Sequence, residues 1–292
     1  VVKFVVPFAA GSATDTLARV LGRKMAAILG QPVVVDNMPG ASGFLAAQNV
    51  ARAEPDGYTV MITSSTTHAA NQSLFRKLPY DPVADFAPVS KLGTIALALV
   101  VNPAVPATTV PELIAYAKAH PGEVTFGSGS SSSRIAGEML KALAGIDLLN
   151  VPYKSNPQAI TDLMGGQISM VFADISTTLP QTGVGKVRAL AVSSPERARL
   201  APNLPTMREA GVAGYDLTAW FAAFVPAGTP PEVIDRLNGA FRAALADPSA
   251  TRTLLGAGIE PATSTPAELA AFVGTETEKW AGIVRSAGIE PE

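Results

Sequence analysis

The start of the chain combines residue types that can bind an anion. Ser12 and Asp15 have the spacing of a capping box, in which a serine hydroxyl accepts a hydrogen bond from a peptide N–H at a helix start. Gly11, Ala13 and Thr14 carry small side chains that leave the peptide groups of this turn uncovered. Unbonded N–H groups at a helix N-terminus attract negative charge. We therefore predict a carboxylate or phosphate site at this turn.

A second polar cluster lies near the middle of the chain. It contains five serines followed by an arginine: Ser128, Ser130, Ser131, Ser132, Ser133 and Arg134. A guanidinium can hold a carboxylate through two parallel hydrogen bonds, so Arg134 is a candidate ligand residue. The alternative is an ion pair with Glu138, one helical turn further on.

Two carboxylates and one aromatic side chain complete the candidates near these turns. The Asp15 carboxylate fits a helix cap better than a ligand contact, because of its spacing from Ser12. Asp174 follows a strand-like run, where it could bind a ligand donor or cap the next helix. Phe8 could pack against an apolar part of a ligand or fill the core.

The chain has two histidines and no cysteine, which limits nucleophilic catalysis. His120 precedes Pro-Gly and fits a helix C-terminus. His68 follows Ser65 and Thr66, and it could pair with a serine nucleophile at Ser64 or Ser128. No G-x-S-x-G motif is present to expose such a serine, so we expect His68 to line a pocket or order its loop. We assign no catalytic residue, metal site or cofactor, because no ligand cluster or cofactor motif is found.

Composition excludes several classes of protein. The chain has 292 residues, of which 48% are hydrophobic and 16% charged, and a net charge of −2. Such a sequence can bury a large core, and it carries no basic footprint for nucleic acid. No apolar run reaches the length of a membrane span, so we expect no direct membrane insertion.

Strand-like apolar runs alternate with helical segments along the chain, which predicts an α/β fold with mixed or mostly parallel sheets. Four connections that follow strands are rich in glycine, hydroxyl or short polar groups. They span residues 8–14, 63–67, 127–133 and 173–178. Ligands in open α/β sheets bind beyond the carboxyl ends of the strands, so we expect these loops to form one pocket.

An ordered set of motifs covers essentially the whole chain. It begins with Pro7-Phe8-Ala9-Ala10-Gly11-Ser12-Ala13-Thr14-Asp15 and continues with Gly30-Gln31-Pro32, Pro55-Asp56-Gly57-Tyr58, Val151-Pro152-Tyr153-Lys154 and Pro226-Ala227-Gly228-Thr229-Pro230. In this order the motifs resemble those of the Bug-type, or tripartite tricarboxylate transporter, substrate-binding proteins. The chain departs from the pattern at three places: Ser12 and Ser155 stand where glycine is usual, and Arg134 stands where histidine is common.

The resemblance implies a two-lobed periplasmic binding protein, or flytrap, fold with two hinge crossings. One lobe would comprise residues 1–100 and 222–292, and the other residues 101–221, with crossings near 101–103 and 221–226. In this family, the loops that match residues 8–14 and 127–133 grip a ligand carboxylate. Closure of the two lobes around the ligand is the expected motion.

The resemblance further implies a periplasmic monomer that delivers a small organic carboxylate to membrane permease subunits, with a secretory leader upstream of the mature chain. Arg134 would suit a dicarboxylate, and Phe8 would tolerate an aromatic diacid such as terephthalate beside short aliphatic diacids. Two alternatives stay open at this point. One is a ligand-sensing module of a signalling system, and the other is a hydrolase that uses His68 and a serine.

Overall fold

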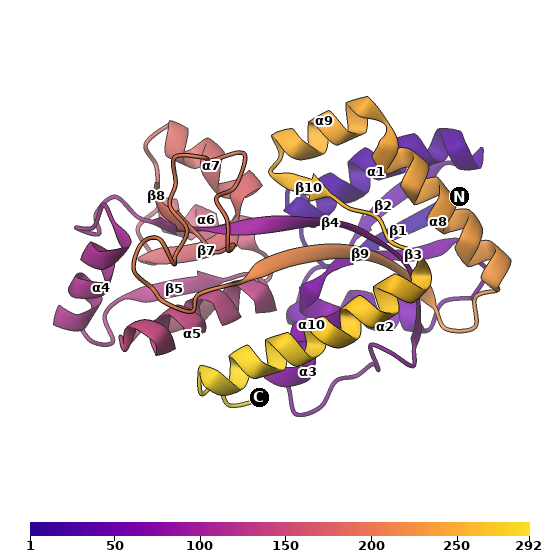
Figure 1. Cartoon of the computed structure of the whole chain (residues 1–292). Helices are drawn as coiled ribbons and strands as arrows, with labels where there is room; N and C mark the ends of the chain where they lie inside the picture. Colours follow the sequence, from indigo (N-terminus) through magenta and orange to yellow (C-terminus); the bar gives the residue numbers. More distant parts are fainter. The chain divides into compact units, whose positions relative to one another are not determined.

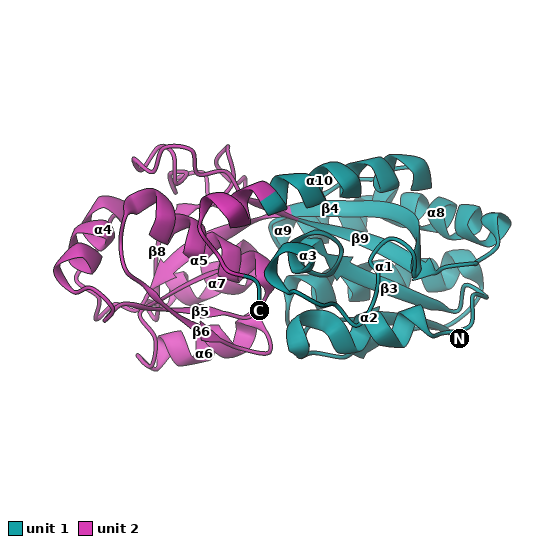
Figure 2. Ribbon diagram, turned by 90° about the horizontal axis from the view of Figure 1, so that it is seen from below, with its two compact units in different colours: residues 1–94, 220–281, 291–292 teal, residues 95–219, 282–290 magenta.

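Two units, each a sheet with its covering helices, make up the computed structural model, which describes residues 1–292. Unit 1 comprises Val1–Thr94, Trp220–Ala281 and Pro291–Glu292, and unit 2 comprises Ile95–Ala219 and Gly282–Glu290 (Figure 2). Three elements contribute residues to both units: strands β4 (Phe86–Val101) and β9 (Thr218–Pro226), and helix α10 (Pro266–Ser286).

Unit 1 contains the first three strands and most of the long helices (Figure 1). Besides its parts of β4, β9 and α10, its elements are β1 (Val2–Val6), α1 (Ala13–Leu29), β2 (Val33–Asn37), η1 (Ala41–Gly43), α2 (Phe44–Ala51), β3 (Thr59–Ser64), η2 (Thr66–Ala70), α3 (Asn71–Leu74), α8 (Pro231–Ala246), α9 (Pro248–Gly256) and β10 (Ile259–Pro261).

The sheet of unit 1 has the order β2-β1-β3-β9-β4, and β10 pairs with β4. Strand β1 runs parallel to β2 and β3, whereas β9 runs antiparallel to β3. Helix α1 follows β1 and buries an apolar face that includes Leu17, Leu21 and Met25. It ends at Gly30 in the left-handed conformation (φ 66°), a backbone geometry that glycine adopts without strain.

Unit 2 contains four further strands and four helices. Besides its parts of β4, β9 and α10, its elements are α4 (Val110–Ala119), β5 (Thr125–Ser128), α5 (Ser131–Ala144), β6 (Leu149–Pro152), α6 (Asn156–Met164), β7 (Met170–Asp174), α7 (Ile175–Gly183) and β8 (Arg188–Val192).

The sheet of unit 2 has the order β4-β7-β5-β6, and β8 pairs with β4. Strand β5 runs parallel to both β6 and β7, whereas β7 runs antiparallel to β4. In its core, Phe172 stacks on Tyr215 with ring centroids 5.8 Å apart, and the Tyr215 hydroxyl donates to the Ala136 carbonyl at 2.7 Å. This bond ties helix α5 to the segment before β9.

The mixed α/β architecture confirms the fold class predicted from the sequence. One part of the prediction is wrong: residues 131–133 are not in a loop but form the first turn of α5, which Ser130 caps. Strands β6 and β10 are short and were not predicted. No helix of the chain has both the length and the apolar character needed to cross a bilayer.

Candidate functional site

The carboxyl ends of β1, β2 and β3 lie at one edge of the sheet of unit 1, because the three strands are parallel. The loops that leave this edge are packed tightly together. A Cβ atom built on Gly43 would lie 2.7 Å from Thr67 Cγ2 and 3.1 Å from Pro7 Cβ, and Gly43 itself has φ +84°. Only glycine fits this position, so the loops after the three strands meet at it.

Helix α1 begins at this edge with the predicted cap. Ser12 is the N-cap residue, and its hydroxyl accepts a hydrogen bond from the Asp15 N–H at 3.2 Å. Its backbone is extended (φ −70°, ψ 160°), whereas Gly11 has φ +83°. The N–H groups of Ala13 and Thr14 have no hydrogen-bond partner in the chain, and a helix start in this state is an anion-binding feature.

The Asp15 carboxylate is buried and makes its bonds within unit 1. Its oxygens accept from the Gly11 N–H at 3.0 Å, from Asn37 Nδ2 at 3.0 Å and from Arg19 Nε at 3.0 Å, and Arg19 Nη2 lies 2.9 Å away. Asn37 also donates to the Phe8 carbonyl at 3.0 Å. Burial would raise the pKa of Asp15, but the bonds from Arg19, Gly11 and Asn37 outweigh it and lower that pKa below its usual value.

Arg19 and Asn37 were not predicted from the sequence. Asn37 is 22 residues from Asp15, so no local spacing connects the two. Arg19 looks in the sequence like any exposed residue of an amphipathic helix. The ring of Phe8 is 6% exposed, so it is packed into unit 1.

The third loop of this edge holds the other predicted residues of unit 1. Ser65, Thr66 and His68 are buried, and residues 66–70 form a π-helical turn. The Thr66 N–H donates to Ser64 Oγ at 3.3 Å, but the buried Thr66 hydroxyl has no partner. Such a group is costly unless a ligand or water satisfies it.

His68 lies in the core of unit 1. Its ring stacks on Phe224 at 3.8 Å and contacts the edge of Phe86, and Nδ1 lies 2.8 Å from the Thr67 hydroxyl. Burial lowers the pKa of His68 to about 3, so the imidazole is neutral. The two serines considered as nucleophiles have other partners: Ser64 Oγ accepts from Thr66, and Ser128 Oγ donates to Asn150 Oδ1 at 2.7 Å. This geometry suits a residue that orders its loop.

Unit 2 has a comparable edge, where parallel strands β5, β6 and β7 end before helices α5, α6 and α7. Ser130 is the N-cap of α5 and accepts from the Ser133 N–H at 3.1 Å. Ser131 and Ser132 are buried in the first turn, and Ser133 Oγ donates to the Phe172 carbonyl. Ser128 and Ser130–Ser133 therefore lie at one edge of the sheet of unit 2.

Arg134 and Asp174 lie at helix starts on this edge. Arg134 is half-buried in the first turn of α5. Asp174 is the N-cap residue of α7 without a side-chain cap bond. Ser176, in the first turn of α7, has a buried hydroxyl without a partner, and it was not singled out in the sequence although it lies in the predicted loop 173–178.

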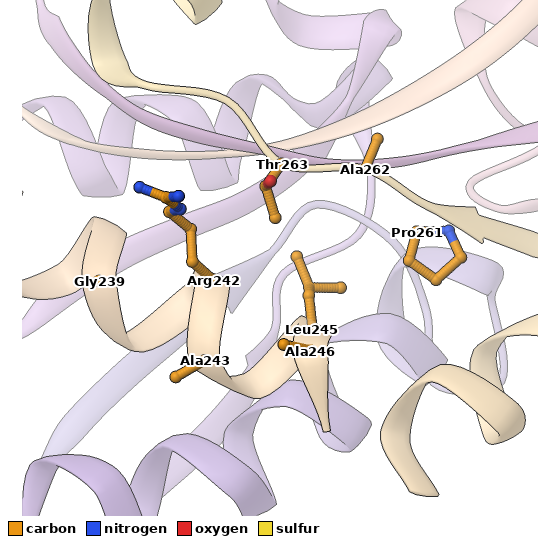
Figure 3. Close-up of a pocket in the computed structure, with 8 residues that line it drawn as sticks. All are labelled: Gly239, Arg242, Ala243, Leu245, Ala246, Pro261, Ala262 and Thr263. Atoms are coloured by element: carbon orange, nitrogen blue, oxygen red, sulfur yellow. The ribbon is translucent and has the colours of Figure 1, made fainter. Parts of the chain in front are cut away.

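A groove on unit 1 is lined by none of the site residues predicted from the sequence. It has a volume of about 600 Å³ and is lined by Gly239, Arg242, Ala243, Leu245, Ala246, Pro261, Ala262 and Thr263 (Figure 3). Arg242 is its one charged residue, and its charge acts on Glu268, whose pKa is lowered chiefly by hydrogen bonds from Thr265. No set of polar groups converges there, so the groove does not have the character of a ligand site.

Comparison with known proteins identifies the family. Residues 17–289 match the family described as Tripartite tricarboxylate transporter family receptor. BugT of Bordetella pertussis is 36% identical over 290 residues, which cover 98% of this chain and 89% of that protein.

Two solved structures extend the comparison to bound ligands. Rpa4515 of R. palustris, solved with adipate, has a TM-score of 0.97 and 35% identity, and the match covers 100% of this chain and 98% of that one. MatC from Rhodopseudomonas palustris, solved with malate, has a TM-score of 0.91 and 34% identity, with 97% and 98% covered. The chain belongs to the tripartite tricarboxylate transporter receptor family, whose members are periplasmic solute-binding proteins.

Proposed function

We propose that this protein binds a small dicarboxylate in the periplasm and delivers it to the membrane permease of a tripartite tricarboxylate-type transporter. The observation that carries the proposal is the start of helix α1. There, two peptide N–H groups are unbonded, and the nearest acidic group is already paired with Arg19.

The groups that can bind a ligand at this edge of unit 1 are uncharged hydrogen-bond donors. The N–H groups of Ala13 and Thr14 point out of the first turn of α1, where the helix dipole adds positive potential. The Thr66 hydroxyl, on the loop after β3, is a further donor without a partner. Together these groups can satisfy the oxygens of one carboxylate without a full positive charge.

A second carboxylate is the reason for proposing a diacid. Arg134, in the first turn of α5, supplies a cation at the edge of unit 2, where the serines supply further polar groups. Adipate and malate, with which two of the similar structures were solved, are both dicarboxylates. Aromatic diacids such as terephthalate stay within the proposal, since Phe8 lies beside the α1 turn.

The test compares diacids with monoacids on two proteins. Isothermal titration calorimetry with adipate, malate, terephthalate and hexanoate should give one site per chain and tighter binding of at least one diacid. Arg134→Gln should weaken that diacid by about tenfold or more, because one charge-assisted pair is lost, and should leave hexanoate within about twofold. Glu138→Gln is the matched control on the same helix.

The outcomes separate the parts of the proposal. Equal losses for diacid and monoacid in Arg134→Gln would remove Arg134 from the site, and preference for hexanoate would contradict the diacid assignment. A product that accumulates with time and protein concentration, seen by mass spectrometry, would show an enzyme instead. Lobe closure, the lobe boundaries and the monomeric state stay predictions.

A further inference from the structure

We propose that Arg19 is a positioning residue that cancels the charge of Asp15, and that anion binding at the start of α1 depends on this cancellation. The inference rests on the proposed function, because it concerns the same carboxylate site. It assigns a role to Arg19 and Asn37, neither of which needs to touch the ligand.

The problem that Arg19 solves is electrostatic. Asp15 is the third residue of α1, one position beyond the unbonded N–H groups of Ala13 and Thr14. A carboxylate so close would repel a bound anion and oppose the attraction of the helix dipole. Asp15 is only 3% exposed, so water screens its charge poorly.

The geometry shows how the charge is cancelled. Arg19, one turn further along α1, reaches back so that Nε and Nη2 lie 3.0 Å and 2.9 Å from the two oxygens of Asp15. The guanidinium and the carboxylate therefore form two parallel bonds, as a fork. The Arg19 side chain is 49% exposed, so the cation stays on the solvent side. The pKa of Arg19 is raised by its bond to Asp15, so the pair stays ionised.

Asn37 fixes this pair to the neighbouring strand. Its side chain donates to Asp15 Oδ1 and to the Phe8 carbonyl, and its oxygen accepts from Arg19 Nη2 at 3.1 Å. The Gly11 N–H also donates a hydrogen bond to Asp15 Oδ2, at 3.0 Å. With four donors on two oxygens, the carboxylate is held in the turn and is not presented to a ligand.

Other charged groups near this cluster have partners elsewhere. Asp36 precedes Asn37 on β2, and its carboxylate faces Lys3 on β1 at 3.9 Å. Lys24 lies further along α1 than Asp15 and forms an ion pair with Asp247 at 3.0 Å. Arg19 is therefore the cation that faces Asp15.

The experiment measures adipate and malate binding by calorimetry in three variants at pH 8. Arg19→Gln should bind about tenfold more weakly than wild type, since an uncancelled charge then faces the ligand.

Two further variants separate charge from structure. Asp15→Asn combined with Arg19→Gln restores a neutral turn and should recover affinity to within about threefold of wild type. Arg23→Gln removes the same charge from the exposed side of α1 and should bind like wild type.

Two results would overturn the inference. These are a double variant as weak as Arg19→Gln, or an Arg19→Gln protein that binds like wild type. Either of these with a wild-type protein that binds diacids would leave the proposed function intact. No diacid binding to the wild-type protein would overturn both.

Discussion

Replacing Thr66 by valine should stabilise the ligand-free protein and weaken its ligand binding. The Thr66 side chain has no exposed surface, and its hydroxyl has no hydrogen-bond partner. An unsatisfied buried hydroxyl costs about 1–3 kcal/mol, and valine keeps the shape of the side chain without that group. We expect a gain of about 1 kcal/mol, which corresponds to about 2–4 °C in the unfolding midpoint of a unit of this size.

The same hydroxyl should bind an oxygen of the ligand. A hydrogen bond to a charged group contributes about 1.5–3 kcal/mol, so Thr66→Val should lower diacid affinity by about tenfold or more. Calorimetry supplies the affinity, and thermal unfolding followed by circular dichroism supplies the stability of the ligand-free protein.

Thr67→Val is the matched control, because the two residues are adjacent and both fully buried. Its hydroxyl lies 2.7 Å from Thr63 Oγ1 and 2.8 Å from His68 Nδ1, and both bonds would be lost. We expect this variant to lose about 2 kcal/mol of stability, a change of opposite sign. If Thr66→Val lost stability as Thr67→Val does, or kept full affinity, the assignment of an unsatisfied donor at Thr66 would be refuted.

Two further predictions concern the unit interiors. Gly129→Ala should lower the free energy of unfolding of unit 2 by about 3 kcal/mol or more in chemical denaturation, because the new Cβ would lie 2.1 Å from the backbone of Ser155 and Asn156. Gly183→Ala is the control and should be nearly neutral, since nothing lies within 4 Å of its Cβ. Similar losses in both variants would contradict the argument. The second concerns His68, whose pKa is about 3 in the folded protein and near 6.5 in an unfolded chain. The unfolded state therefore binds a proton at this histidine more tightly than the folded state does. The free energy of unfolding should therefore fall from pH 6.5 toward pH 4.5 by about 1 kcal/mol per pH unit, and urea titrations of His68→Gln should lose most of that slope. An unchanged slope in His68→Gln would show that other groups cause it.

Local signals explain which parts of the structure were predictable from the sequence. The Ser12 cap of α1 is present as predicted, and Thr265 and Glu268 form a capping box of the same spacing at α10. In both cases the hydrogen-bond partners are three residues apart, so spacing alone specifies them.

Contacts between residues distant in sequence explain most of the features that were not predicted. The pairing of Asn37 with Asp15 requires β1 and β2 to be neighbours in register, which no local pattern states. The apolar run at residues 96–101 predicts a strand, but strand β4 begins ten residues earlier, at Phe86. A Cβ at Gly93 would lie 2.7 Å from the Glu260 carbonyl, so this glycine permits the approach of β10. The hydroxyl-rich composition of Ser131–Ser133 predicts a loop, yet a helix start capped by Ser130 also accepts these residues.

Backbone geometry also shows what the serine at position 12 adds. The family pattern has a second glycine there, but the conformation of Ser12 is extended and any residue can adopt it, whereas Gly11 alone requires a positive φ. The hydroxyl of Ser12 accepts the Asp15 N–H and keeps its own proton to donate. A glycine would leave only peptide donors at this turn. The serine therefore adds one more neutral donor beside Ala13 and Thr14, at a turn whose acidic residue is held by Arg19, and this favours an anion over an uncharged ligand.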